Sequence, residues 1–285
     1  MNKWMNLVGV CILLILLTAC SQPATPTKET SKESTSDLTL QNVFTQSLAQ
    51  SEKLDSLSAS IDMTQVVEIP AQKISMETSS KMDMDMIVEP LSLHQEGTTS
   101  MNMLGEETLG APAEMKIESY LSDQGFFMFD SMSSQWLKLP KDMYEQIMSM
   151  SKNQADPSQQ LKDLESFMDD FTFEQDEHSY ILKLAASGDE FNTLMQKQLA
   201  DTMPDMVVKE QELLENMNVE KVNFEIFIDK QTFNILTLNM VIDMTMAVEG
   251  ENMRITQDIK SSYSKFNEVK SIEIPQDVIN QAQEM

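Results

Sequence analysis

The chain has 285 residues, a formal net charge of −26 and 41% hydrophobic residues. This acidity argues against nucleic-acid binding and against attachment to anionic lipid through a basic patch. With only seven glycines, Gly-rich phosphate-binding loops are not expected, whereas 25 methionines are unusually many.

The first 20 residues combine a short apolar run with a small-residue cleavage site. Lys3 supplies a positive start, and residues 7–17 are uninterruptedly apolar, which is too short for a transmembrane helix of about 20 residues. The stretch Leu17-Thr18-Ala19-Cys20 resembles a bacterial lipobox. That resemblance implies removal of residues 1–19 as a lipoprotein signal peptide and a diacylglycerol anchor on Cys20. Cys11 would leave with the leader, so no disulfide or Cys-based metal site is expected in the mature chain.

The segment that follows is poor in apolar side chains. Residues 21–37 are rich in Ser, Thr, Pro and Lys and cannot bury enough surface to offset the entropy of ordering. We therefore predict that residues 20–38 are the lipid anchor and a disordered tether, with a coil reach of roughly 20–25 Å.

Residues 39–285 alternate between two periodicities. Apolar residues at helical spacing predict a helix over 39–55, and a period of two from Ser58 predicts long strands, the clearest over 74–88. Further strands are predicted at 115–121, 126–130 and 135–139, followed by helices from Pro140 and from Asp156-Pro157. A hairpin over 171–184 and a helix around 191–199 follow, and 206–217 is interpreted as helical. The last third predicts strands at 222–228, 240–248 and from 253, and a short helix after Pro275.

This order of elements predicts a single α+β domain over 39–285. We expect one curved, unclosed antiparallel β-barrel with its helices packed on the concave side.

Residues that would mark an enzyme are sparse. His94 and His178 lie far apart in the sequence, and no catalytic triad, HExxH or GxSxG motif is present. Asp83 and Asp85 lack the spacing of a calcium-binding loop. We therefore expect no enzymatic activity, no cofactor and no metal site of this kind, and both histidines are interpreted as structural or surface residues.

The methionines allow three interpretations. Met82, Met84 and Met86, like Met244 and Met246, have the MxM spacing of some extracytoplasmic Cu(I) sites, because thioether sulfur is a soft ligand. Ile74 and Val88 share the parity of the first group, which favours simple core packing over copper. A third interpretation is a cavity for an apolar ligand, since flexible, polarizable methionine adapts to varied partners.

Several motifs resemble those of an uncharacterised group of Gram-positive surface lipoproteins. They are GFFMFDSMSSQWLKLP (125–140), FEIFIDKQTF (224–233), MTMAVEG (244–250) and IEIPQDVINQAQEM (272–285). That group in turn resembles the LolA/LolB/LppX superfamily of lipoprotein and lipid carriers. The resemblance implies a LolA-like half-barrel, helices that act as a lid and a hydrophobic cavity for acyl chains.

The sequence thus predicts a lipoprotein on the extracytoplasmic face of the cell membrane that binds a lipid or another apolar ligand. The predicted cavity residues lie on the concave side and are Met82, Met84, Met86, Met240, Met244 and Met246. Two alternatives stay open: a non-enzymatic envelope or interaction protein with a packed core, and a Cu(I)-binding protein. The sequence identifies no protein partner.

Overall fold

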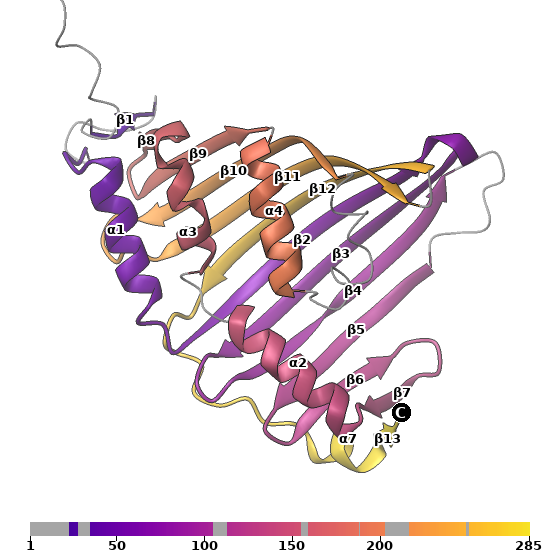
Figure 1. Ribbon diagram of the computed structural model, residues 1–285. Coiled ribbons are helices and arrows are strands. Elements are labelled where there is room, and N and C mark those ends of the chain that lie inside the picture. Colours follow the sequence, from indigo (N-terminus) through magenta and orange to yellow (C-terminus); the bar gives the residue numbers. More distant parts are fainter. Residues whose placement is uncertain are drawn as a thin grey trace, which may run out of the picture.

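The chain folds around one sheet of thirteen strands, seen in the computed structural model, which describes residues 23–27, 35–104, 113–154, 159–187, 189–202, 217–248 and 251–285. The strand order is β1-β8-β9-β10-β11-β12-β2-β3-β4-β5-β6-β7-β13, and the sheet is not closed (Figure 1). The strands are β1 Thr25–Pro26, β2 Ser56–Ile69, β3 Ile74–Ile87, β4 Ser92–Leu104, β5 Ala113–Ser122, β6 Gly125–Asp130, β7 Gln135–Lys138, β8 Thr172–Gln175, β9 Ser179–Ala186, β10 Asn218–Asp229, β11 Ile235–Val248, β12 Glu251–Ser264 and β13 Gln283–Glu284.

The sequence periodicity explains the long central strands. β3 runs from Ile74 to Ile87, as the period of two predicted, and pairs along its full length with β2. Neighbouring long strands are antiparallel, whereas the short β1 and β13 pair in parallel with β8 and β7. The sheet is therefore mixed rather than purely antiparallel, and its two outermost strands are short segments from the two ends of the described chain.

Five α-helices occur in the described residues, together with two 3-10 helices. They are α1 Leu40–Ser51, α2 Lys141–Gln154, α3 Gln159–Leu164, α4 Asp189–Thr202 and α7 Gln276–Gln281, with η2 Pro70–Gln72 and η3 Glu165–Asp170. Helix α1 begins where predicted because Thr39 and Asn42 form a capping box. Helices α1 to α4 lie over one face of the sheet (Figure 1).

Two apolar clusters lie under these helices. The larger cluster joins Val43 of α1, Phe167 of η3 and Phe191 of α4 to Leu182 of β9 and Ile226 of β10, all at most 5% exposed. The second cluster lies near the opposite edge, where Tyr144, Ile147 and Met148 of α2 pack against buried side chains that include Leu57, Met86 and Leu121. Separate helix groups therefore cover the two ends of one sheet face.

The expectation that all helices pack on the same side is wrong for α7. Val278 of α7 and Ile274 pack against Tyr120 and Phe127, which have the opposite strand parity from Leu121 and Phe126. Because successive strand residues point to opposite faces, the C-terminal segment covers the other face of the sheet. With thirteen strands and few helices, the architecture is mostly β rather than the predicted α+β.

The prediction of a disordered tether over 20–38 is also wrong for the parts of it that the structure describes. Ala24 is 3% exposed, and Thr25 and Pro26 pair with Glu174 and Gln175. Gln175, itself 1% exposed, donates from Nε2 to the carbonyl oxygens of Ala24 (2.8 Å) and Ser36 (3.1 Å). We call residues 23–27 and 35–36 the N-terminal strap, because hydrogen bonds to the backbone and side chain of Gln175 hold both pieces on β8. The rest of the predicted tether, Cys20 included, lies outside the described residues.

Among the described residues no helix is both long and apolar enough to cross a membrane. The helix predicted after Asp156-Pro157 is confirmed as α3, which η3 follows directly, although the cap residues themselves lie outside the described residues. The helical interpretation of 206–217 lies outside the described residues except for Met217.

Candidate functional site

The register of the sheet places every methionine of the described strands on one face. Met82 of β3 lies opposite Ile61 of β2, and Ile61 opposite Ser261 of β12, which pairs with Leu238 of β11. Side chains of directly paired residues share a face, so the same parity can be followed across the long strands. We call this side, which α1 to α4 cover in part, the methionine face; its methionines are Met63, Met76, Met82, Met84, Met86, Met101, Met103, Met115, Met128, Met240, Met244, Met246 and Met253.

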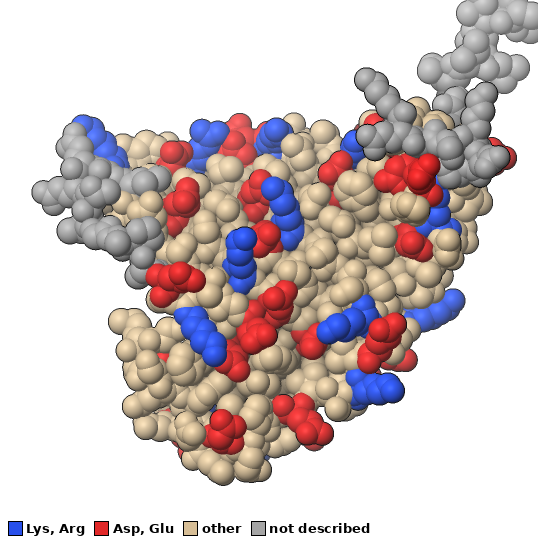
Figure 2. Space-filling model, turned by 180° about the vertical axis from the view of Figure 1, so that it is seen from behind, with Lys and Arg blue, Asp and Glu red and all other residues tan. Residues whose placement is uncertain are grey.

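The methionine face carries no charge in the middle of the sheet. In β2, β3, β4 and β5 every Asp, Glu and Lys has the opposite parity, so these charges lie on the other face. Figure 2, which views the molecule from behind, shows acidic and basic side chains spread over that charged face. The segregation indicates that the methionine face favours apolar or uncharged partners.

The six predicted cavity methionines all lie on the methionine face, but their environments differ. Met86 and Met244 are 9% exposed members of the two apolar clusters. Met84, Met240 and Met246 are partly buried and pack against those clusters. Met82 belongs to neither cluster formed by the described residues. Five of the six therefore contribute to packing, and only Met82 lies in the region between the clusters.

An open segment of the methionine face surrounds Met82. We define it by Met63, Met76, Met82, Met101 and Met103, none of which joins either cluster of the described residues. Met101 and Met103 are 42% and 45% exposed, and Ile74 at the end of β3 is 37% exposed. Contiguous exposed apolar side chains on a soluble domain commonly mark a binding surface.

Two polar pairs interrupt this open segment. Gln257 Nε2 donates to Gln65 Oε1 at 2.9 Å and approaches Met63 Sδ at 3.9 Å. Ser80 Oγ and Thr99 Oγ1 lie 2.8 Å apart, and Ser80 is buried. Gln65 and Gln257 face each other directly across β2 and β12, so the amide pair lies on a side that is otherwise apolar there.

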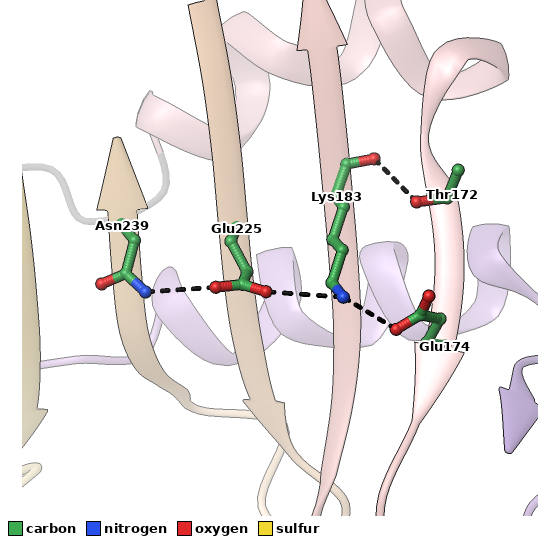
Figure 3. A network of polar contacts seen from close by, with 5 residues as sticks. All are labelled: Thr172, Glu174, Lys183, Glu225 and Asn239. Carbon is green, nitrogen blue, oxygen red and sulfur yellow. Dashed lines mark hydrogen bonds and ion pairs between the residues drawn. The ribbon is translucent and has the colours of Figure 1, made fainter. Parts of the chain in front are cut away.

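The charged face is organised by cross-strand ion pairs. Lys183 Nζ lies 2.9 Å from Glu174 Oε2 and 3.5 Å from Glu225 Oε1, and Asn239 Nδ2 donates to Glu225 Oε2 at 3.3 Å (Figure 3). The Thr172 hydroxyl adds a hydrogen bond to the Lys183 carbonyl oxygen. The hydrogen bond to Glu174 raises the pKa of Lys183 and so favours the charged form of this lysine. Such partly exposed pairs link strands β8 to β11.

A shallow hollow on the charged face holds the titratable residues considered from sequence. Its volume is about 270 Å³, and Asp83, Asp85 and His94 line it with Ser58 and Lys265. The Ser58 hydroxyl donates to Asp85 Oδ1, and the His94 ring stacks on Tyr120 with centroids 4.3 Å apart. In the described part of the chain, no three His, Cys, Asp or Glu side chains are placed to hold a metal ion.

The other histidine lies elsewhere. His178 is exposed in the β8–β9 turn, where its backbone N–H donates to Asp176 Oδ1 at 2.8 Å. The structure therefore does not bring His94 and His178 together.

Comparison with known families gives a match over residues 39–283, which is nearly the whole described fold. The chain belongs to DUF6612. This is a family of unknown function. No curated protein matches this DUF6612 member.

Two solved structures show distant similarity to this DUF6612 chain. One is a DUF1329 family protein from Desulfovibrio piger, with 9% identity, coverage of 81% of this chain and 95% of that one, and a TM-score of 0.23. The other is a β-barrel-like protein of the domain of unknown function DUF1849 from Brucella abortus, with 12% identity, coverage of 73% and 98%, and a TM-score of 0.17.

Sequence reasoning missed the amide pair and the exposed end of the face. The sequence did carry a signal for the amide pair, because Gln65 lies between Met63 and Val67 in the alternating pattern, at a position where an apolar residue is expected. Gln257 stands in the same way between Ile255 and Ile259. Only the register of β2 and β12 shows that the two amides meet.

Proposed function

We propose that this DUF6612 protein is a membrane-anchored extracytoplasmic lipoprotein that binds a lipid or another apolar ligand on the methionine face. The observation that carries the proposal is the open segment, a methionine-rich surface without charged residues on β2, β3 and β4, which extends from Met82 to the exposed ends of β3 and β4. The LolA-like half-barrel that the sequence motifs imply agrees with this proposal in its general form, an open sheet with an apolar side.

The physical basis is the adaptability of methionine. Its side chain is unbranched, flexible and polarizable, so a surface of methionines adjusts to acyl chains of varied length and saturation. Burying each methylene group of such a chain contributes about 0.8 kcal/mol. Ten methylenes therefore contribute about 8 kcal/mol before the entropic costs of association, which is enough to make binding favourable on a surface with few polar contacts.

Of the alternatives, copper binding has less support. Met84 and Met86 pack with Leu57 and Leu121 in the apolar cluster under α2, which accounts for their spacing by core packing. The packed-core alternative describes these positions well, but it does not account for the exposure of Met101 and Met103.

The membrane anchor is proposed from the lipobox at Cys20. An anchored protein meets lipid at its own membrane, so binding and localisation support each other. We propose a binding role without catalysis and without a cofactor.

Native mass spectrometry and displacement of a fluorescent fatty-acid probe test the binding proposal. The purified chain should retain lipid, and Met82→Lys should weaken probe binding by about tenfold or more, because a buried unpaired charge is strongly unfavourable. Met132→Lys is the matched control, since Met132 is 90% exposed in the β6–β7 turn and outside the open segment. Circular dichroism spectra of both variants check that each one folds. Absence of retained lipid together with absence of probe binding would reject the proposal.

A further inference from the structure

The Gln65–Gln257 pair leaves one amide NH2 group and one amide oxygen free on the methionine face. The single hydrogen bond between the two amides uses Gln257 Nε2 and Gln65 Oε1. Within the described residues, Gln65 Nε2 and Gln257 Oε1 have no protein partner, and neither atom is completely buried. An amide has two N–H donors and one acceptor oxygen, so reversing both side chains would leave the same kinds of free group.

Apolar side chains border this pair along both strands. On the same face, the next cross-strand pair in one direction along the strands is Val67 with Ile255. In the other direction it is Met63 with Ile259. No charged residue of β2 or β12 has this parity between Met253 and Tyr263 or between Leu57 and Ile69. On the described parts of β2 and β12, a ligand on the open segment would therefore meet the two neutral amides and no charged side chain.

A charged head group is disfavoured on such a surface. Moving a carboxylate or phosphate from water to an apolar surface without a counter-charge is costly, whereas a neutral polar group needs only its hydrogen bonds replaced. The charge segregation described above puts the lysines of β3 and β5 on the opposite side of the sheet.

We propose that the open segment selects an uncharged amphiphile, such as a monoacyl- or diacylglycerol, over fatty acids and phospholipids. The ester carbonyl would accept from Gln65 Nε2, a glycerol hydroxyl would donate to Gln257 Oε1, and the acyl chain would lie along Met63, Met76 and Met82. This inference rests on the proposed lipid-binding function and names the ligand class for that site.

A competition assay tests the ligand class on the full-length protein. The reporter is an environment-sensitive fluorescent acyl ester, and the competitors are monooleoylglycerol and oleate, which share one acyl chain, used below their aggregation concentrations. Monooleoylglycerol should compete at least about tenfold more strongly at pH 8, where oleate is charged. As the pH falls through the pKa of the fatty acid, its competition should rise while that of the glyceride stays constant.

Variants separate the role of the two amides from nonspecific hydrophobic binding. Gln65→Leu with Gln257→Leu should weaken glyceride binding by roughly 3- to 10-fold, the value of one or two neutral hydrogen bonds, while a plain long-chain alkene binds as before. Gln95→Leu is the control, because Gln95 lies on the same face beside Met84 and outside the open segment. Equal competition by oleate and glyceride, or an unchanged double variant, would overturn this inference and leave the lipid-binding function standing. Failure of every amphiphile to compete would overturn both.

Discussion

The side chain of Gln175 binds both backbone groups of Ser36. Its Nε2 donates to the Ser36 carbonyl oxygen at 3.1 Å, and its Oε1 accepts from the Ser36 N–H at 2.8 Å. The Tyr180 hydroxyl donates to Ser36 Oγ at 2.7 Å, and Gln175 also reaches Ala24. One buried amide of the edge strand β8 thus fixes both halves of the N-terminal strap.

Replacing Gln175 by Ala should release the strap. Three hydrogen bonds to backbone groups are lost, and buried groups left without partners make the loss about 2–4 kcal/mol. We expect a lower urea midpoint and faster proteolytic cleavage within residues 23–38, measured by mass spectrometry. Gln231→Ala is the control, because Gln231 is exposed and its side chain makes no hydrogen bond among the described contacts. Unchanged cleavage in the Gln175 variant would show that other contacts hold the strap.

Gly97 permits a close approach of β3 and β4 beside Met82. A β-carbon at this position would lie 2.0 Å from the Lys81 carbonyl oxygen and 2.8 Å from Met82 Cα. Since both are backbone atoms, Gly97→Ala should destabilise the fold by about 3 kcal/mol, at the upper end of the cost of overpacking. Thermal unfolding measures this, and Thr98→Ala, at an exposed neighbouring position, should change stability by no more than about 0.5 kcal/mol. A Gly97→Ala variant with the melting temperature of the wild type would contradict the close approach of the β3 and β4 backbones at this position.

The single arginine of the sequence should give a pH-dependent contribution to stability. Arg254 donates from Nε to Asp243 Oδ1 at 2.9 Å and from Nη2 to Oδ2 at 2.6 Å, and these bonds lower the pKa of Asp243. Because the folded-state pKa lies below the unfolded value of about 3.9, the stabilisation is complete above that value. It is lost as the pH falls through the folded-state pKa.

Arg254→Gln should therefore lower the urea midpoint at pH 7 only modestly, because the arginine side chain is 50% exposed and solvent screens the ion pair. The difference from wild type should shrink below about pH 4 and vanish in stronger acid, as measured by urea unfolding at several pH values. Lys81→Gln is the control, since Lys81 and Asp62 are both highly exposed and 3.9 Å apart. A difference that persists unchanged into strong acid would exclude the ion pair as its cause.

Cys20→Ala should abolish metabolic labelling by radioactive palmitate and release the protein from the membrane or leave it unprocessed. Stable anchoring needs more than one acyl chain, and the proposed diacylglycerol supplies two. Cys11→Ala keeps the lipobox and should label like wild type, so it separates lipidation from a general effect of cysteine loss. Equal labelling of both variants would exclude Cys20 as the lipid site.

Local periodicity predicted the long strands and their faces well. Ile74 to Met86 alternate with charged residues, and a side-chain period of two leaves a single face for the apolar set. The parity of Met82, Met84 and Met86 therefore followed from sequence, and the paired strands confirm it.

Long-range contacts could not be predicted in the same way. Residues 21–37 lack large apolar side chains, and their described parts are ordered by Gln175, which lies 139 residues from Ser36. Nothing local in the segment encodes that contact. The position of α7 had a weak signal in the sequence. Phe126 and Phe127 are consecutive apolar residues whose side chains point to opposite faces of β6, which indicates that both faces of this strand are covered.

The N-terminal strap also bears on how the molecule would stand at a membrane. If lipid is attached to Cys20, three peptide steps separate it from Pro23, and these span at most about 11 Å. Pro23 is bridged to Thr39 beside β8, so that edge would rest close to the bilayer. The β7 edge lies ten strand spacings further along the sheet, about 48 Å at the usual separation of strands. The sheet would then be oriented with its β8 edge at the bilayer, and the methionine face would extend away from the lipid surface.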